Sequence, residues 1–121
     1  MIENNFGQLG ATQKEALAKV EPIIDGILKA QDDIDYDAFC SFFEGGLRTQ
    51  ITQQDFENNA KNIQQTMGKL KEKQFLTTLN RQGLVALIYK CRFDGSDDDF
   101  TITFTINDKS EPLKASGIWI S

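Results

Sequence analysis

Apolar side chains in the first half of the chain recur every three or four residues, the spacing of a helix that packs one face against a core. The first such stripe comprises Leu17, Val20, Ile24, Ile27 and Leu28. Thr12 precedes the stripe, and Glu15 lies three residues after Thr12, as in a capping box that begins a helix. Pro22 lies inside this stretch, and proline lacks a backbone donor and clashes with the carbonyl four residues earlier. We therefore expect a kink or a second helix start at Pro22.

The same spacing predicts two further helices. Asp35 can cap a short second helix, which Gly45-Gly46 would end. The apolar face of that helix would carry Tyr36, Phe39, Cys40, Phe43 and Leu47. Thr52, with Asp55 three residues on, predicts the start of a third helix, and Gly68 marks its end. The stripe of this third helix comprises Phe56, Ala60, Ile63, Met67 and Leu70.

The second half of the chain has the two-residue period of β-strands. Phe100, Ile102, Phe104 and Ile106 alternate with three threonines. Strands are expected over residues 71–80, 84–93, 100–106 and 113–120. The connecting turns are short and therefore favour antiparallel pairing of consecutive strands. The predicted fold is α+β, with N-terminal helices packed on a curved four-stranded antiparallel meander. Residues 12–121 would form one domain, and residues 1–11 a flexible N-terminal segment.

Composition and charge exclude several function classes. Eighteen acidic residues against thirteen basic ones give a net charge of −5, which argues against nucleic-acid binding. No apolar run reaches the roughly 20 residues of a membrane helix. No signal peptide is recognised, so the default expectation is a cytoplasmic protein. The chain has no histidine, which removes the Ser-His and Cys-His catalytic pairs and histidine-ligated metals. Cys40 and Cys91 are interpreted as small buried apolar residues.

Three charged clusters invite chemical roles but have simpler explanations. The acidic run at residues 94–99 lies where a hairpin must turn, and it lacks the order of a calcium loop. The aspartates of residues 32–37 lie at a predicted helix N-terminus, where carboxylates cap amides. Lys69, Lys71 and Lys73 could meet an acidic partner, but they are interpreted as a solvated face of a strand or as charges that prevent edge-to-edge pairing. We expect no metal and no cofactor.

Several segments resemble the nuclear transport factor 2-like superfamily, whose members have helices closing over a curved sheet. Residues 32–39, followed by Phe42-Phe43, resemble the acidic turn and aromatic entry to the second helix of that superfamily. Residues 52–68 are similar to the third helix of small uncharacterised bacterial members. Residues 89–93, 100–104 and 117–120 resemble their last three strands. The resemblance implies the fold, but the superfamily contains both enzymes and binding modules, so it does not choose between them.

The absence of histidine and of an evident nucleophile-base pair favours a non-catalytic module that binds a small apolar ligand or a protein partner. A homodimer through the sheet is expected, because helices can cover only one sheet face. The predicted pocket residues are Tyr36, Phe39, Phe43, Tyr89, Phe104 and Trp119. The alternative is an isomerase- or cyclase-like enzyme that uses a buried carboxylate with a tyrosine. Glu44 and Asp55 are the carboxylates considered for it.

Overall fold

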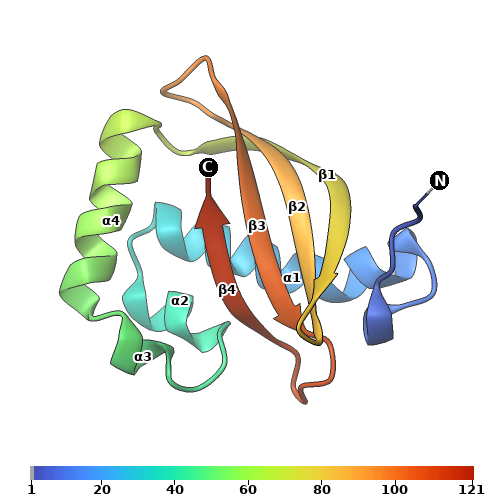
Figure 1. Ribbon diagram of the computed structural model, residues 1–121. Helices are drawn as coiled ribbons and strands as arrows, with labels where there is room; N and C mark the ends of the chain where they lie inside the picture. The colour runs from blue at the N-terminus through green and yellow to red at the C-terminus, as the bar shows by residue number, and fades with distance from the viewer. Residues whose placement is uncertain (1) are drawn as a thin grey trace.

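The computed structural model describes residues 2–121 and has helices followed by one antiparallel sheet (Figure 1). A short 3-10 helix, η1 (Gly7–Leu9), precedes the longer elements. The helices are α1 (Gln13–Asp32), α2 (Tyr36–Ser41), α3 (Leu47–Gln50) and α4 (Gln53–Thr66). The strands are β1 (Leu70–Arg81), β2 (Leu84–Phe93), β3 (Asp99–Asn107) and β4 (Lys114–Ile120). The predicted α+β class is confirmed.

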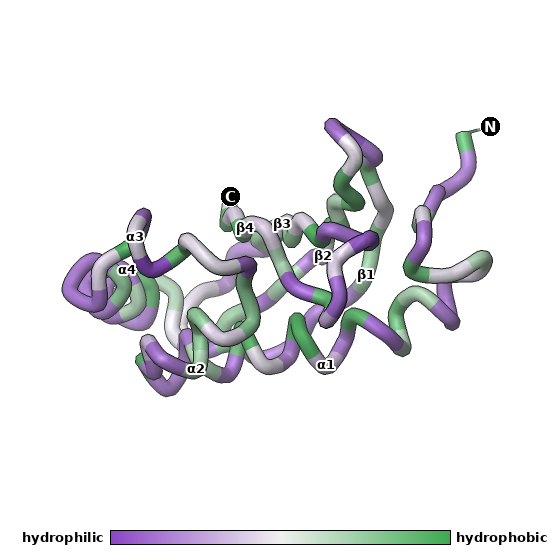
Figure 2. The backbone as a smooth tube through the Cα atoms, turned by 90° about the horizontal axis from the view of Figure 1, so that it is seen from below, coloured by the Kyte–Doolittle hydropathy of each residue, from purple (hydrophilic) through white to green (hydrophobic). Residues whose placement is uncertain are grey.

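The sheet is a meander in the order β1-β2-β3-β4, and every neighbouring pair is antiparallel. Figure 2 shows α1 and α2 on one side of the sheet and α4 beyond β4, at the end away from β1. Within residues 2–121, no helix lies on the opposite face of the sheet (Figure 2). β4 is therefore an edge strand with a helix beside it, and this arrangement positions the site described below.

The core lies between α1 and the inner face of the sheet. α1 contributes a fully buried row at the predicted three- and four-residue spacing, which includes Val20, Ile24 and Ile27. Alternate residues of β2 and β3 meet it, as the two-residue period requires. Tyr89 and Phe104 lie at the centre, with ring centroids 5.8 Å apart and an interplanar angle of 87°. Large aromatic side chains thus fill the space between the layers.

Several predicted helix boundaries were wrong. α1 continues through Pro22 as one helix, so no second helix starts there. α2 ends at Ser41, and Leu47 belongs to the separate helix α3, because Gly46 has a positive φ of 115° that breaks the helical path. Leu70 belongs to β1 and not to the third predicted helix, which ends before Gly68.

Residues that follow α2 pair with the edge of β4. Phe43 forms a parallel bridge with Ala115. The N–H of Ala115 donates to the carbonyl of Phe42, and the N–H of Glu44 donates to the carbonyl of Ala115, both at 2.9 Å. This pairing joins the helical layer to the sheet edge and explains why Phe43 leaves the helix that its spacing predicted.

Residues 2–11, which belong to the segment expected to be flexible, contact the sheet and the core. Phe6 and Leu9 are buried in the core. The side-chain oxygen of Asn4 accepts a 3.1 Å hydrogen bond from the N–H of Thr78 in β1. The carboxylate of Asp108, in the β3–β4 loop, accepts a 2.6 Å hydrogen bond from the N–H of Gln8. Two apolar residues are too few to give a periodic signal in the sequence. Met1 lies outside the described residues.

Replacing Leu9 with alanine tests this anchoring. Leu9 is only 1% exposed, so Leu9→Ala should lower the free energy of unfolding by about 2–5 kcal/mol, as for other buried leucines. Ile2, which is 98% exposed, supplies the matched control, and Ile2→Ala should change the free energy of unfolding by less than about 0.5 kcal/mol. Urea denaturation measures both. Equal stability of the two variants would contradict a packed N-terminal segment.

Gly26 forms the contact between α1 and the end of α2. A Cβ atom on Gly26 would lie 2.6 Å from Cε1 of Phe42, closer than real contacts allow. Alanine normally favours a helix over glycine by about 1 kcal/mol. Here the displaced Phe42 ring should reverse that gain, so Gly26→Ala should destabilise the fold by about 1–3 kcal/mol. Gly45→Ala is the control, since no atom lies within 4 Å of its Cβ position. Thermal unfolding that shows Gly26→Ala to be the more stable variant would refute this packing.

Candidate functional site

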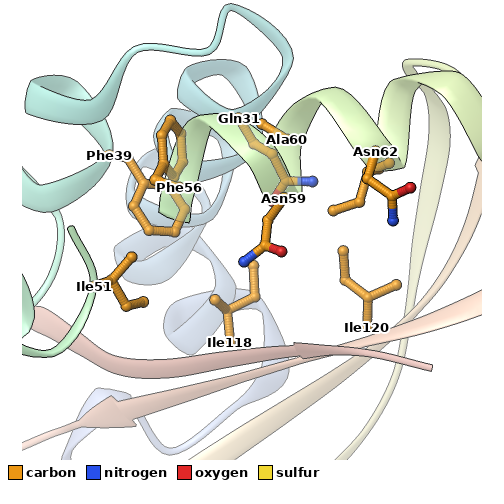
Figure 3. A pocket seen from close by; sticks show the side chains of 10 residues that line it. Gln31, Phe39, Ile51, Phe56, Asn59, Ala60, Asn62, Ile118 and Ile120 are labelled. Carbon is orange, nitrogen blue, oxygen red and sulfur yellow. The ribbon is translucent and has the colours of Figure 1, made fainter. Parts of the chain in front are cut away.

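The best-formed pocket among the described residues lies between α4 and the edge strand β4, with a volume of about 280 Å³ (Figure 3). Its walls are mostly hydrocarbon and aromatic. The lining residues are Gln31, Phe39, Ile51, Phe56, Asn59, Ala60, Asn62, Ile63, Ile118 and Ile120. α1, α2, α4, β4 and the α3–α4 connection all contribute, so the pocket exists only in the folded chain.

A bulge in β4 decides which of its side chains line the pocket. Ile106 pairs with Ala115 and Thr105 pairs with Gly117, so Ser116 is an extra residue on the β4 side. An extra residue shifts the alternation of side chains by one. Ala115 therefore faces the core, and after the bulge Ile118 and Ile120 face the same side, towards the helices. Trp119 points to the opposite side of the sheet and is 58% exposed.

Aromatic rings from α2 and α4 form the closed end of the pocket. Phe39 and Phe56 lie with ring centroids 4.6 Å apart, and Tyr36 lies behind Phe56 at 5.9 Å. The Tyr36 hydroxyl donates a 2.7 Å hydrogen bond to the carbonyl of Ile51. Burial raises the pKa of Tyr36, which keeps this hydroxyl protonated and able to donate. The bond fixes Ile51 at the pocket wall.

The polar groups of the pocket are side-chain amides. Figure 3 shows the amide of Asn59 pointing from α4 towards Ile118, across the space between helix and strand. Asn62 lies one turn further along α4, and Gln31 of α1 is 92% buried behind them. Amides both donate and accept hydrogen bonds and carry no charge at any ordinary pH. The pocket thus combines an apolar wall with neutral hydrogen-bonding groups.

The six residues predicted from the sequence to form a pocket are not brought together in one. Phe39 lines the pocket and Tyr36 supports it from behind Phe56. Tyr89 and Phe104 are buried at the centre of the core, so they fill the space that the sequence assigned to a ligand. Phe43 lies in the core beside Phe39, and Trp119 lies on the outer face of the sheet.

The residues that sequence reasoning missed are mainly Ile51, Asn59, Ile118 and Ile120. The alternation of side chains in the last strand could have indicated Ile118 and Ile120, because both lie on one face of that strand. The helical stripe of α4 passes next to Asn59, which follows the buried Phe56 by three positions. Nothing local indicated that this face of α4 lies beside this strand, since the β1–β3 strands separate the two segments in the sequence.

A second polar cluster joins β1 to α1 on the inner side of the sheet, away from the pocket. Lys73 Nζ lies 2.7 Å from Glu21 Oε2 and 3.3 Å from Asp25 Oδ1. Lys73 was expected on a solvated face, but a register shift at Lys71 interrupts the simple alternation and Lys73 faces α1. The Tyr89 hydroxyl beside it is buried without a hydrogen-bond partner in the described part of the chain. Burial also raises the pKa of this tyrosine.

Other candidate reactive groups lie outside the pocket. Cys40 and Cys91 are buried free thiols, which confirms their interpretation as small core residues. Burial raises the pKa of Cys91 to about 11, so it stays protonated near neutral pH. Glu44 is exposed and accepts a 2.9 Å hydrogen bond from the Asn107 amide. Asp55 is exposed in the first turn of α4.

Neither a metal site nor a membrane helix was found within residues 2–121. No group of three or more histidine, cysteine, aspartate or glutamate side chains is arranged to hold a metal ion there. None of the helices in that range combines the length and apolar character needed to cross a membrane. The acidic run at residues 94–99 covers the β2–β3 turn and the first residue of β3, and the Asp94 carboxylate accepts a 2.8 Å hydrogen bond from the N–H of Lys69.

Comparisons with known proteins give one match. Residues 26–112 match a protein family described as "Protein of unknown function" (DUF3887). No curated protein and no solved structure matches the chain. The matched region contains α2, α3, α4 and the first three strands and covers well over half of the 121 residues. The chain therefore belongs to the DUF3887 family of proteins of unknown function.

Proposed function

We propose that this protein binds a small, largely apolar ligand in the pocket between α4 and β4 and does not transform it. The supporting observation is the composition of the pocket wall, in which hydrocarbon and aromatic side chains lie beside three neutral amides. Ligand sites are typically apolar cavities with a few convergent polar groups that fix orientation. A ligand that matches this wall has a short hydrocarbon body and one uncharged group that both donates and accepts.

The proposal of binding without turnover rests on the chemistry of the lining. None of the ten lining side chains carries a carboxyl, thiol, amine or hydroxyl group, so none has a proton to exchange near neutral pH. The Tyr36 hydroxyl is engaged with the carbonyl of Ile51. Glu44 and Asp55, the carboxylates considered for an isomerase- or cyclase-like enzyme, are both exposed and neither lines the pocket.

The family resemblance proposed from the sequence is compatible with this function. We propose that the chain is a nuclear transport factor 2-like protein, on the basis of the aromatic entry to α2 and the strand motifs quoted above. Helices that precede a curved four-stranded antiparallel sheet support that assignment at the level of the fold. Since that superfamily includes non-catalytic binding modules, the assignment agrees with binding alone.

Filling the pocket from its rim tests the binding proposal. A thermal-shift screen with small apolar amides and alcohols should find compounds that raise the melting temperature, because a ligand of the native state stabilises it. Asn59→Trp places an indole in the pocket and should abolish those shifts. Asn59 is exposed, so the variant should fold normally.

Asn58→Trp is the matched control for that experiment. Asn58 is also exposed on α4 but is not a lining residue, so its tryptophan variant should keep the ligand shifts of the wild type. A screen without any stabilising compound would contradict ligand binding. Chemical conversion of a stabilising compound during incubation would contradict the absence of turnover.

We also propose a homodimer that forms through the uncovered sheet face. Cross-strand pairing places Ile88, Thr103 and Trp119 in one row across this face. The adjacent row carries Leu79, which is 44% exposed, beside Ala86. An uncharged patch of this kind suits an isologous contact between two copies.

A charge at Trp119 tests the dimer. Trp119→Glu would bring two carboxylates into the contact around the symmetry axis and should leave the protein monomeric, because desolvating like charges is costly. Light scattering at micromolar concentration measures the mass. Ile2→Glu, at an exposed position outside the sheet, should leave the mass unchanged. A monomeric wild-type protein under these conditions would refute the dimer.

A further inference from the structure

The part of β4 that borders the pocket has unpaired backbone groups. Thr101 and Ser121 exchange both N–H···O bonds, each 2.9 Å long. Opposite residues in an antiparallel pair alternate between exchanging hydrogen bonds and not exchanging them. The β3–β4 register is regular over this stretch, so Ile118 and Ile120 occupy the pairs without hydrogen bonds. Their N–H and C=O groups therefore point away from β3, towards the open edge of the sheet.

The chain already pairs with this edge at one point. Phe42 and Glu44 hydrogen bond to both backbone groups of Ala115. The chain then turns away at Gly45-Gly46, and no backbone group from a loop or helix within residues 2–121 bonds to Ile118 or Ile120. The edge is thus paired at its first half and open at its second half. A further extended segment there would continue a pairing that the fold has begun.

The pocket lies directly beside the open half of the edge. The side chains of Ile118 and Ile120 form one wall, and Asn59 and Asn62 of α4 form the opposite one. Figure 3 shows the Asn59 amide directed across this space. Neither asparagine amide is hydrogen bonded within residues 2–121, and an amide matches the donor and acceptor of a peptide group. Backbone-matching groups therefore line both sides of the same space.

We propose that the natural occupant of this pocket is an extended peptide segment that adds to β4 as a fifth strand. The proposal rests on the proposed binding function and specifies its ligand class. The N–H and C=O groups of Ile118 and Ile120 pair with the peptide backbone, as in other complexes formed by strand addition. Alternate peptide side chains point to opposite faces, so one apolar side chain enters the cavity between Phe39, Phe56 and Ala60. The partner is an uncharged, apolar stretch of polypeptide.

A second copy of the chain fits this edge less well than a single segment. α4 lies alongside β4 beyond the sheet edge (Figures 1 and 2). A symmetric pairing of two β4 strands would bring the α4 helices of both copies against each other's sheet. A single extended segment needs only the width of one strand, about 4.8 Å between neighbouring strands.

Selection of peptides identifies the occupant. A phage-displayed library of random seven-residue peptides is selected on the full-length protein, and the enriched sequences are synthesised with both ends capped. Binding of these peptides should shift the ¹H–¹⁵N signals of Ile118 and Ile120 downfield and slow their amide exchange. Each peptide is also made with N-methyl groups on the amides of one edge, which removes the donors and should abolish binding.

A pair of variants at one position separates backbone pairing from filling of the pocket. Ile120→Pro removes the outward N–H, and proline is tolerated at an edge strand because no ladder bond to β3 is lost. This variant should bind the peptides about tenfold more weakly, or worse. Ile120→Ala keeps the N–H but also truncates the side chain, so it should bind the peptides several-fold more tightly than Ile120→Pro does. Thermal unfolding and the ¹H–¹⁵N spectrum establish that both variants are folded.

The outcomes distinguish this inference from the proposed function. Failure to enrich any peptide, or equal binding to the two Ile120 variants when both are folded, overturns the strand-addition proposal. If small apolar compounds still stabilise the protein and Asn59→Trp still abolishes that effect, the binding function stands without a peptide ligand. If neither peptides nor small compounds bind, both proposals fail. If Ile120→Pro does not fold, the N-methylated peptides decide, and their undiminished binding overturns the inference.

Discussion

The one-residue bulge at Ser116 is the constraint on which the rest of this structure depends. Before the bulge, the side chain of Ala115 points into the core, and the backbone of Ala115 forms hydrogen bonds with Phe42 and Glu44. After it, the alternation has shifted, so that Ile118 and Ile120 face the helices. A regular strand that buried Ala115 would turn the two isoleucines outward and Trp119 inward. The apolar wall beside α4 would then be lost, and an indole would have to fit in its place.

Close packing around α2 locates the opposite wall. Gly26 lets Phe42 lie directly on α1, which brings the end of α2 down to the sheet edge at Ala115. The chain then turns at Gly46 and returns as α4, whose first turn is capped by Thr52. α4 therefore lies alongside β4 and not over the sheet, because the central space is already filled by Tyr89 and Phe104. The pocket therefore lies at the edge of the sheet, because large side chains fill the core.

The polar chemistry of the molecule is divided between two places. The ion pairs between Lys73 and the carboxylates of α1 hold β1 against that helix and leave the Tyr89 hydroxyl enclosed. The pocket has amides alone. This separation means that charge contributes to the architecture, whereas the recognition proposed at the edge of β4 depends on hydrocarbon contact and neutral hydrogen bonds.

The sequence by itself determined the features that depend on near neighbours. The caps at Thr12, Asp35 and Thr52, the helical stripes and the alternation in β3 are local patterns, and each predicted its element. Only the tertiary structure decided the site. The position of the bulge, the packing of Phe42 on Gly26 and the approach of Asn59 to Ile118 depend on contacts between distant segments. Periodicity indicates which side of an element is buried, but not which other element packs against that side. A pocket depends on which elements pack together, so periodicity alone does not predict it.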